Sequence, residues 1–345
     1  MQVVYSDAHL GHDPQLYFRG GTFHDHPEKP ERAERIVTAL RAAGHDILPP
    51  VEHGAAPRAA IHTPEYLGFL ETIHERWTAS GQGADEVIPN IHPGRNMAGR
   101  PTGVLGQVGW HTADLSSPIG AGTWRAACAS ADIALTATGL VLDGAPHAYA
   151  LSRPPGHHAF ADSTGGFCFL NNIAIAAQHA TGRGRRPAIV DIDVHHGNGT
   201  QGIFWRRADV LTVSLHCDPA DFYPFFAGYG AERGEGPGAG YNANFPLPPG
   251  TGDNAFLDAL GEALDAVRRF APDILFVALG LDAYENDPFA GFRISTPGFA
   301  RIARALGETG LPTVLVQEGG YNREDLPKNI TSFLDGFLAG AAEVV

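Results

Sequence analysis

Runs of consecutive apolar residues, separated by stretches with helical periodicity, constrain this chain more than any other feature of its sequence. Within each run the apolar residues do not alternate with polar ones, which is typical of strands buried on both faces. Buried strands that alternate with helices predict a parallel sheet covered by helices, so we expect the α/β class. The expected strands are 3–5, 147–152, 188–192, 210–215, 274–279 and 313–317. The expected helices are 30–43, 64–77, 123–142, 171–180, 254–270, 297–308 and 325–341.

The chain predicts one domain, residues 1–345, because it has no linker, internal repeat or low-complexity tract. Two segments, 79–122 and 217–252, are rich in glycine and proline and show little periodicity. Long ordered loops of this kind are usually functional, so we expect a functional role for both.

The charge balance excludes some classes of partner. Lys and Arg number 24 against 38 Asp and Glu, a formal net charge of −14. This balance argues against nucleic-acid binding and favours cationic or neutral ligands. Three cysteines without a CxxC pair indicate a reducing, cytoplasmic setting. We expect neither a signal peptide nor a membrane span, because the first residues lack a basic start and no long apolar run occurs.

Ionisable side chains follow five of the predicted strands, at the point where each strand ends. In an open parallel sheet, ligands bind beyond the carboxyl ends of the strands. A random scatter of polar residues would not place them so consistently. The residues in these positions are His157, His158, Asp193, His195, His216, Asp282, Glu318 and Tyr321.

Asp193 and His195 predict part of a metal site. Residues two apart at the end of a strand point the same way, so both side chains can reach one ion. Asp282, which follows another strand, is the natural third ligand. Three protein ligands and an open position are typical of catalytic zinc. Two carboxylates and one imidazole also suit Fe(II) or Co(II).

Two further motifs indicate catalysis at the same edge. His157 and His158 follow two prolines and a glycine, a rigid turn that would hold both imidazoles over the metal. Tyr321 follows two glycines, which allow close approach of the backbone to a ligand. Its phenol could donate to a developing oxyanion, although packing of a tyrosine at a turn fits equally well.

Taken together, these motifs resemble the zinc-dependent deacetylases, which include histone deacetylases and bacterial acetylpolyamine amidohydrolases. The chain is most similar to the second branch because of its size, its long 79–122 insertion ending in GTW, and its HHGNGT motif. The motifs are HPEKPERAERI at 26–36, RPPGHH at 153–158, GGFCFLNN at 165–172, DIDVHHGNGT at 191–200, SLH at 214–216, LGLDAYENDP at 279–288 and EGGY at 318–321.

The resemblance implies a single-domain arginase/deacetylase fold, with eight parallel strands flanked by helices. It implies zinc on Asp193, His195 and Asp282. It makes His158 the general base and acid and His157 its electrostatic partner, with Tyr321 as oxyanion donor. In relatives an aspartate at the position of Asp191 supports the first histidine of the pair. The same residue helps to hold a potassium ion, here with Ser214 and with the carbonyl groups of Asp193, His195 and Leu215.

The resemblance also implies a narrow channel for a linear substrate, formed at Gly166 and walled by Phe167 and Tyr223. Relatives can hold the distal ammonium of a polyamine with acidic residues of the insertion. Within 106–120 the only carboxylate is Asp114, which could do this or cap a turn. Asn198 stands where many histone deacetylases have aspartate, and we expect the neutral amide to keep His158 neutral.

We therefore expect hydrolysis of an acetylpolyamine, such as acetylputrescine or acetylspermidine, by a cytoplasmic homodimer assembled through the insertion. The alternative within enzymes is a deacylase of acetyl-lysine peptides or of other small amides. An arginase-like ureohydrolase would need a two-metal cluster with more carboxylates, and the stretch from Asp193 to Asn198 lacks the extra aspartate. A non-catalytic binding protein would have lost a zinc ligand or Tyr321, and neither is lost.

Overall fold

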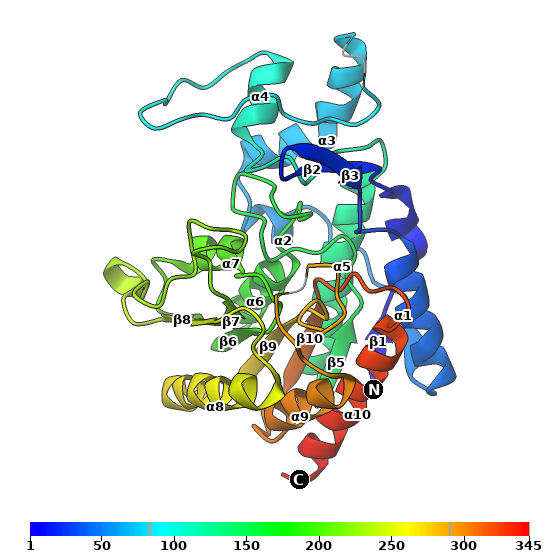
Figure 1. The fold of residues 1–345 in the computed structure, drawn as a ribbon, viewed down its shortest axis with the longest axis vertical. Coiled ribbons are helices and arrows are strands. Elements are labelled where there is room, and N and C mark those ends of the chain that lie inside the picture. The colour runs from blue at the N-terminus through cyan, green and yellow to red at the C-terminus, as the bar shows by residue number, and fades with distance from the viewer. Residues whose placement is uncertain (82–83, 290, 345) are drawn as a thin grey trace.

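The computed structural model describes residues 1–81, 84–289 and 291–344, and a parallel sheet of eight strands forms its centre (Figure 1). The strands lie in the order β4-β1-β5-β10-β9-β6-β7-β8, and all neighbours run parallel. This confirms the expected fold class. The strands are β1 Gln2–Val4, β4 Asp46–Leu48, β5 His147–Ala150, β6 Pro187–Asp191, β7 Leu211–Cys217, β8 Asn242–Leu247, β9 Ile274–Leu279 and β10 Thr313–Gln317.

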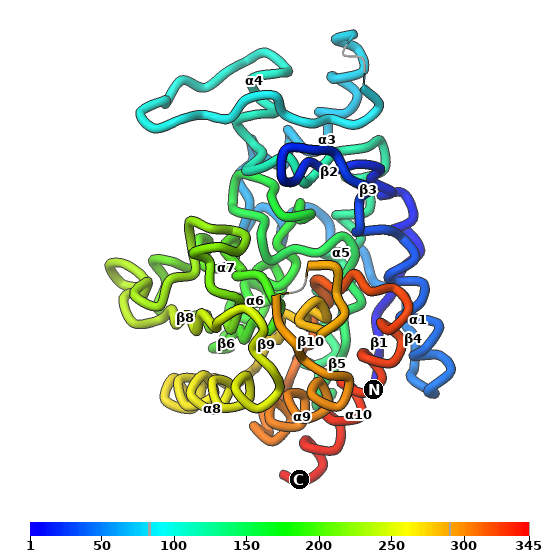
Figure 2. Tube along the Cα trace, viewed as in Figure 1, coloured from blue at the N-terminus to red at the C-terminus, as the bar shows by residue number. Residues whose placement is uncertain are grey.

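Helices cover both faces of this sheet, because each strand sends alternate side chains to opposite sides. Val3 belongs to the core cluster that contains buried residues of α1, α8, α9 and α10, whereas Val4 belongs to the cluster that contains buried residues of α3, α5 and α6. The trace in Figure 2 brings the C-terminal α10 beside α1, which it contacts. The first layer is α1 Glu31–Ala42, α8 Asp253–Phe270, α9 Thr296–Gly307 and α10 Leu326–Ala342. The second is α3 Pro64–Ala79, α5 Thr123–Leu142, α6 Asn172–Gly182 and the short α7 Asn198–Phe204.

The two edge strands of the sheet were not predicted. The 217–252 segment, expected as a loop, contains β8, whose side chains are only partly buried in its second half. β4 has three residues and begins with an aspartate. An edge strand has a neighbouring strand on one side only and is less buried than the central strands. Its sequence therefore lacks the continuous apolar run that marks the central strands.

The 79–122 segment is also not wholly irregular. It contains α4 Val104–Trp110, and Figure 1 shows it projecting from one end of the molecule near the hairpin of β2 Leu16–Arg19 and β3 Thr22–Asp25. Residues 82–83 of this segment lie outside the described residues. The short α2 Ala56–Ala59 and the 3₁₀ turns Asp7–Gly11 and Gly236–Gly238 complete the elements.

Helix α5 is long and apolar enough to cross a membrane, judged by length and composition alone. In the fold, however, 61% of its most apolar window is buried. It packs against α6 and β5 in the second helical layer. This is the environment of a core helix, as expected for 123–142.

Candidate active site

The carboxyl ends of β5, β10, β9 and β6 lie side by side at the centre of the sheet. Each strand is followed by a loop that carries one of the expected motifs, so residues far apart in the sequence meet at this edge. The residues brought together are His157 and His158 after β5, Tyr321 after β10, Asp282 after β9, and Asp193 and His195 after β6.

Asp193, His195 and Asp282 form a buried cluster whose ligand atoms all lie within 4.8 Å of one another. His195 Nδ1 lies 3.1 Å from Asp193 Oδ1 and 3.2 Å from Asp282 Oδ2. The other carboxylate oxygens are fixed by backbone donors, Gly319 N to Asp193 Oδ2 and Val194 N to Asp282 Oδ1. Gly319 must be glycine, since a Cβ there would lie 2.2 Å from Asp282 Oδ2.

The chemistry of this cluster fits a divalent metal ion. Asp193 and Asp282 are fully buried next to each other, where two carboxylates repel unless a cation lies between them. One nitrogen and two oxygens converge on the same point, a donor set that suits zinc and also Fe²⁺ or Co²⁺. The three residues identified from the sequence could therefore hold a metal.

His157 is held by two carboxylates. Its Nδ1 donates to Asp191 Oδ2 at 2.9 Å, and its Nε2 lies 3.9 Å from Asp193 Oδ1. Burial lowers the pKa of His157, but Asp191 and Asp193 outweigh burial and raise that pKa to about 10. His157 is therefore a cation at neutral pH.

His158, in contrast to His157, is a neutral imidazole. Its Nδ1 donates to Asn198 Oδ1 at 2.6 Å, which leaves Nε2 as a free acceptor. Burial, and then the neighbouring His157 and His195, hold the pKa of His158 well below 6.5. A neutral imidazole with a free Nε2 can accept a proton, as a general base must.

Tyr321 lies at the end of a loop that several backbone contacts hold. Asp287 Oδ2 accepts from the backbone N of Tyr321 at 2.8 Å. Burial raises the pKa of the Tyr321 phenol well above 10, so the phenol keeps its proton. Glu318, in the same loop, accepts from the backbone N of Gly156 and of His157 and so ties the loops after β5 and β10 together.

His158, His195 and Tyr321 line one cavity of about 340 Å³ with an aromatic wall. The rings of Phe167 and Tyr321 pack edge to face at 5.6 Å, and Tyr223 stands perpendicular to His158 at 5.0 Å. Gly166 has a left-handed backbone with φ of 53°, and a Cβ there would lie 2.2 Å from His158 Cδ2. All four expected substrate-binding positions, Gly166, Phe167, Tyr223 and Asp114, line this cavity.

Asp114 is engaged with protein groups through both carboxylate oxygens. Oδ2 accepts from Tyr223 Oη at 2.6 Å and from the backbone N of Gly166 at 2.9 Å. Oδ1 accepts from the backbone N and the hydroxyl of Ser116 at 2.8 and 2.6 Å. Asp114 therefore closes a turn, as one of the two sequence interpretations has it, and also positions the channel wall.

The residues expected to hold potassium lie beneath the histidine pair. Strand pairing puts Asp191 of β6 beside Ser214 of β7, and Leu215 follows in the same buried strand. Asp191 Oδ1 accepts from the backbone N of Asp193 at 3.1 Å, and Ser214 Oγ donates to His216 Nδ1 at 2.8 Å.

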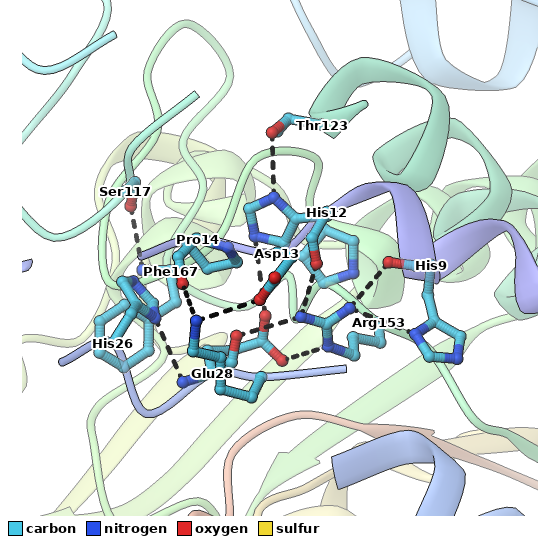
Figure 3. A network of polar contacts seen from close by, with 12 residues as sticks. His9, His12, Asp13, Pro14, His26, Glu28, Ser117, Thr123, Arg153 and Phe167 are labelled. Atoms are coloured by element: carbon cyan, nitrogen blue, oxygen red, sulfur yellow. Dashed lines mark hydrogen bonds and ion pairs between the residues drawn. The ribbon is translucent and has the colours of Figure 1, made fainter. Parts of the chain in front are cut away.

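A buried charge network beside the site was not predicted (Figure 3). Glu28 Oε1 accepts from Arg153 Nε and from Arg32 Nη1, each at 2.7 Å. Arg153 begins the RPPGHH loop and also donates to the carbonyl groups of His9 and His12 at 2.8 Å. Arg32 donates to the carbonyl groups of Glu318 and Gly320. The HPEKPERAERI motif contains both Glu28 and Arg32, but it does not show that their charges are buried.

Other residues of the cavity were also missed. The ring of Phe222 stacks on His195 at 5.1 Å, and Phe289 meets the same imidazole edge to face at 5.4 Å. Tyr17, Arg19 and Asp221 also line the cavity, and of these Arg19 and Asp221 are exposed, at its open side. The segments that contain these five residues carry no motif of ionisable residues. Only the aromatic content of 222–226 indicated that part of this segment lines a cavity.

Comparison with known proteins agrees with this geometry. Residues 26–337 match the histone deacetylase domain family. The chain is 50% identical over 329 residues to an acetylpolyamine amidohydrolase of Burkholderia pseudomallei, covering 95% of this chain and 96% of that protein. It is 38% identical over 338 residues to the acetylpolyamine amidohydrolase of Mycoplana ramosa, covering 97% and 99%. A crystal structure of the Burkholderia pseudomallei acetylpolyamine aminohydrolase matches with a TM-score of 0.95 and 48% identity over 99% of both chains.

Proposed function

This chain belongs to the histone deacetylase family and is a deacetylase of the hydrolase class, and we propose that it cleaves the amide of a linear N-acyl amine to release an amine and acetate. The favoured substrates are acetylpolyamines such as acetylputrescine or acetylspermidine, for which the names of its relatives give support. One observation carries the proposal: His195 of the candidate metal cluster, a neutral histidine and a protonated tyrosine line the same aromatic cavity.

We propose that Asp193, His195 and Asp282 hold zinc. When bound, this ion supplies Lewis acidity, which polarises a carbonyl group and makes water more acidic. The two buried carboxylates and the imidazole support this assignment.

The chain's own residues then move the protons. His158 Nε2 accepts the proton of the attacking water, while Asn198 holds the other ring nitrogen. The positive charge of His157 disfavours a second cation beside it, so His158 readily gives this proton to the leaving amine. Tyr321 Oη donates a hydrogen bond to the carbonyl oxygen as negative charge develops on it.

The aromatic walls orient the substrate and exclude water. Phe167 and Tyr223 line the cavity, Tyr223 stands perpendicular to His158, and Phe222 and Phe289 pack against His195. A lining of this kind favours an unbranched alkyl chain over a bulky one, because a linear chain can pass between the rings.

We also propose that Asp191, Ser214 and the carbonyl of Leu215 hold a potassium ion that stiffens the strand ends beneath the histidines. The pairing of Asp191 with Ser214 supports this. We propose further that the enzyme is a cytoplasmic homodimer whose 79–122 insertion forms the contact. Exposed apolar side chains in this insertion, Ile91 and Met97 among them, support that part.

The test is kcat/KM of the zinc-loaded enzyme on acetylputrescine, acetylspermidine and an acetyl-lysine tripeptide, with Tyr321→Phe as the inactive control. We expect kcat/KM for the acetylpolyamines to exceed that for the tripeptide tenfold or more, which is about 1.4 kcal/mol of discrimination. A higher kcat/KM for the tripeptide would instead identify a deacylase of acetylated peptides. Activity that survives unchanged in Tyr321→Phe would contradict the role of the phenol.

A further inference from the structure

We propose that Arg19 is a specificity-determining residue at the mouth of the cavity, and that it admits substrates with a free carboxylate at their distal end. The class of substrate is the Nω-acetylated diamino acid, of which Nε-acetyl-lysine as a free amino acid is the simplest case. This inference rests on the proposed function and extends it from acetylated amines to acetylated amino acids.

The hairpin of β2 and β3 aims Arg19 at the cavity. Gly20 and Gly21 both have positive φ, 60° and 88°, and form the tight turn between the two strands. Tyr17 and Arg19 are two apart on β2, so they lie on the same face of the strand. Tyr17 packs edge to face on Phe167 at 5.7 Å, which identifies that face as the one toward the channel.

Arg19 is one aromatic ring away from the catalytic groups. Its guanidinium lies over the ring of Phe289, 5.1 Å from the centroid. The same ring packs against Tyr321 at 4.9 Å and against His195 at 5.4 Å. A linear acyl amine with its amide at Tyr321 therefore extends toward the guanidinium along this wall.

The charges around the cavity leave Arg19 and Asp221 free. The residues that line the cavity include three with a permanent charge, Arg19, Asp114 and Asp221. Both carboxylate oxygens of Asp114 already accept hydrogen bonds from protein groups. Within residues 1–81, 84–289 and 291–344, neither Arg19 nor Asp221 forms an ion pair with a protein side chain. The mouth thus presents one cation and one anion that are available to a ligand.

A free amino acid matches both charges. A guanidinium binds a carboxylate through two parallel hydrogen bonds, and the flat ring of Phe289 holds it in place. Asp221, next to Phe222 in the lining of the same cavity, can take the α-ammonium. An acetylated diamine offers an ammonium alone, so it meets Asp221 but leaves the positive charge of Arg19 unpaired and repulsive.

Three matched substrates separate these contributions. Nε-acetyl-lysine, its α-carboxamide and N-acetylcadaverine have the same acetamide and alkyl chain, and only the first has the carboxylate. We would measure kcat/KM of the metal-loaded enzyme for each, with the wild-type chain, Arg19→Gln and Asp221→Asn. Arg206→Gln is the matched control, because it removes a positive charge from an exposed surface pair with Glu235.

We expect the wild-type enzyme to prefer acetyl-lysine over its carboxamide by about fivefold, the upper end of the range for an ion pair that is partly exposed. Arg19→Gln should bring this ratio to about one, mainly through KM, and raise kcat/KM for N-acetylcadaverine. Asp221→Asn should lower kcat/KM for all three substrates together, since each carries the ammonium group. Arg206→Gln should leave all values unchanged.

Two results would overturn the inference. The wild-type enzyme could show no preference for the carboxylate, or Arg19→Gln could show the same preference as the wild type. Either result shows that Arg19 does not bind the carboxylate. If N-acetylcadaverine is still hydrolysed in that case, the proposed function stands without the inference. If none of the three is hydrolysed, and none binds the Tyr321→Phe variant in calorimetry, both the inference and the proposed function fail.

Discussion

Glu28→Gln should destabilise the protein, because the Glu28 carboxylate is shared by two buried arginines. Glu28 is fully buried, and the side chains of Arg32 and Arg153 are 3% and 1% exposed. Glutamine keeps the shape and one acceptor oxygen but removes the charge. Two guanidinium groups then remain in a buried site with no carboxylate ion pair. Loss of one partner of a buried ion pair costs about 3–5 kcal/mol, and we expect the lower end because an acceptor remains.

The expected fall in Tm follows from the size of the chain. Unfolding entropy is about 2 cal/mol/K per residue near the midpoint, so for 345 residues each kcal/mol lowers Tm by about 1.4 °C. A loss of about 3–5 kcal/mol therefore lowers Tm by about 4–7 °C. Differential scanning calorimetry at pH 7 measures this. Glu31→Gln is the control: Glu31 pairs with Arg323 on the surface, and its loss should change Tm by about 1 °C or less.

The pH dependence gives a second check. Burial raises the pKa of Glu28, but Arg153 and Arg32 outweigh burial and hold that pKa at about 2, below its ordinary 4.5. A carboxyl group whose pKa is lower in the folded state stabilises the protein above its unfolded pKa. This stabilisation is lost as the pH falls from about 4.5 towards 2. The gap in Tm between wild type and Glu28→Gln should be constant from pH 8 to 5.5 and shrink below about 4.5. A gap of less than about 1 °C at pH 7 would refute the reasoning.

Three other outcomes are expected. Asp114→Asn should raise KM severalfold for cationic and neutral substrates alike, because it loosens Tyr223; a loss confined to cationic substrates would instead make Asp114 an ammonium ligand. Asn198→Asp should raise the pKa of His158, which must be neutral to act as base, so the acidic limb of the kcat/KM profile should move to higher pH; an unmoved limb contradicts this. Met97→Asp, which places a charge on an exposed apolar side chain of the insertion, should convert a dimer to a monomer of about 37 kDa in light scattering; a wild-type monomer would exclude the dimer.

The central strands and the candidate metal cluster could be predicted because each depends on local sequence. β9 and β10 have the bounds expected from their apolar runs, and Asp193, His195 and Asp282 each lie in the first residues after a strand. The end of a parallel strand fixes where its next residues lie, so strand order alone brings these ligands together. The edge strand β8 lacks a continuous apolar run, and the sequence therefore gave no sign of it.

The buried charge network could not be predicted, because its partners are distant in the sequence. Glu28 and Arg153 are 125 residues apart, and Arg32 reaches a carbonyl 288 residues away. Nothing in PEKPER shows that its charges are buried, since a helix start rich in charge is usually solvated. The hairpin residue Arg19 was missed for a similar reason: its place at the cavity depends on a contact with Phe289, 270 residues later.

The order of strands explains why this network lies beside the site. In the sequence of neighbours β5-β10-β9-β6, the inner pair supplies Tyr321 and Asp282, and the outer pair supplies the two histidines and the remaining metal ligands. The sheet fixes where each loop begins but not how the loops after β5 and β10 sit on each other. Arg153 at the start of the first loop and Arg32 against the second are joined by one carboxylate, Glu28. Loss of this carboxylate should therefore lower kcat as well as Tm, because Glu28 acts with Glu318 to hold the loop of His158 against the loop of Tyr321.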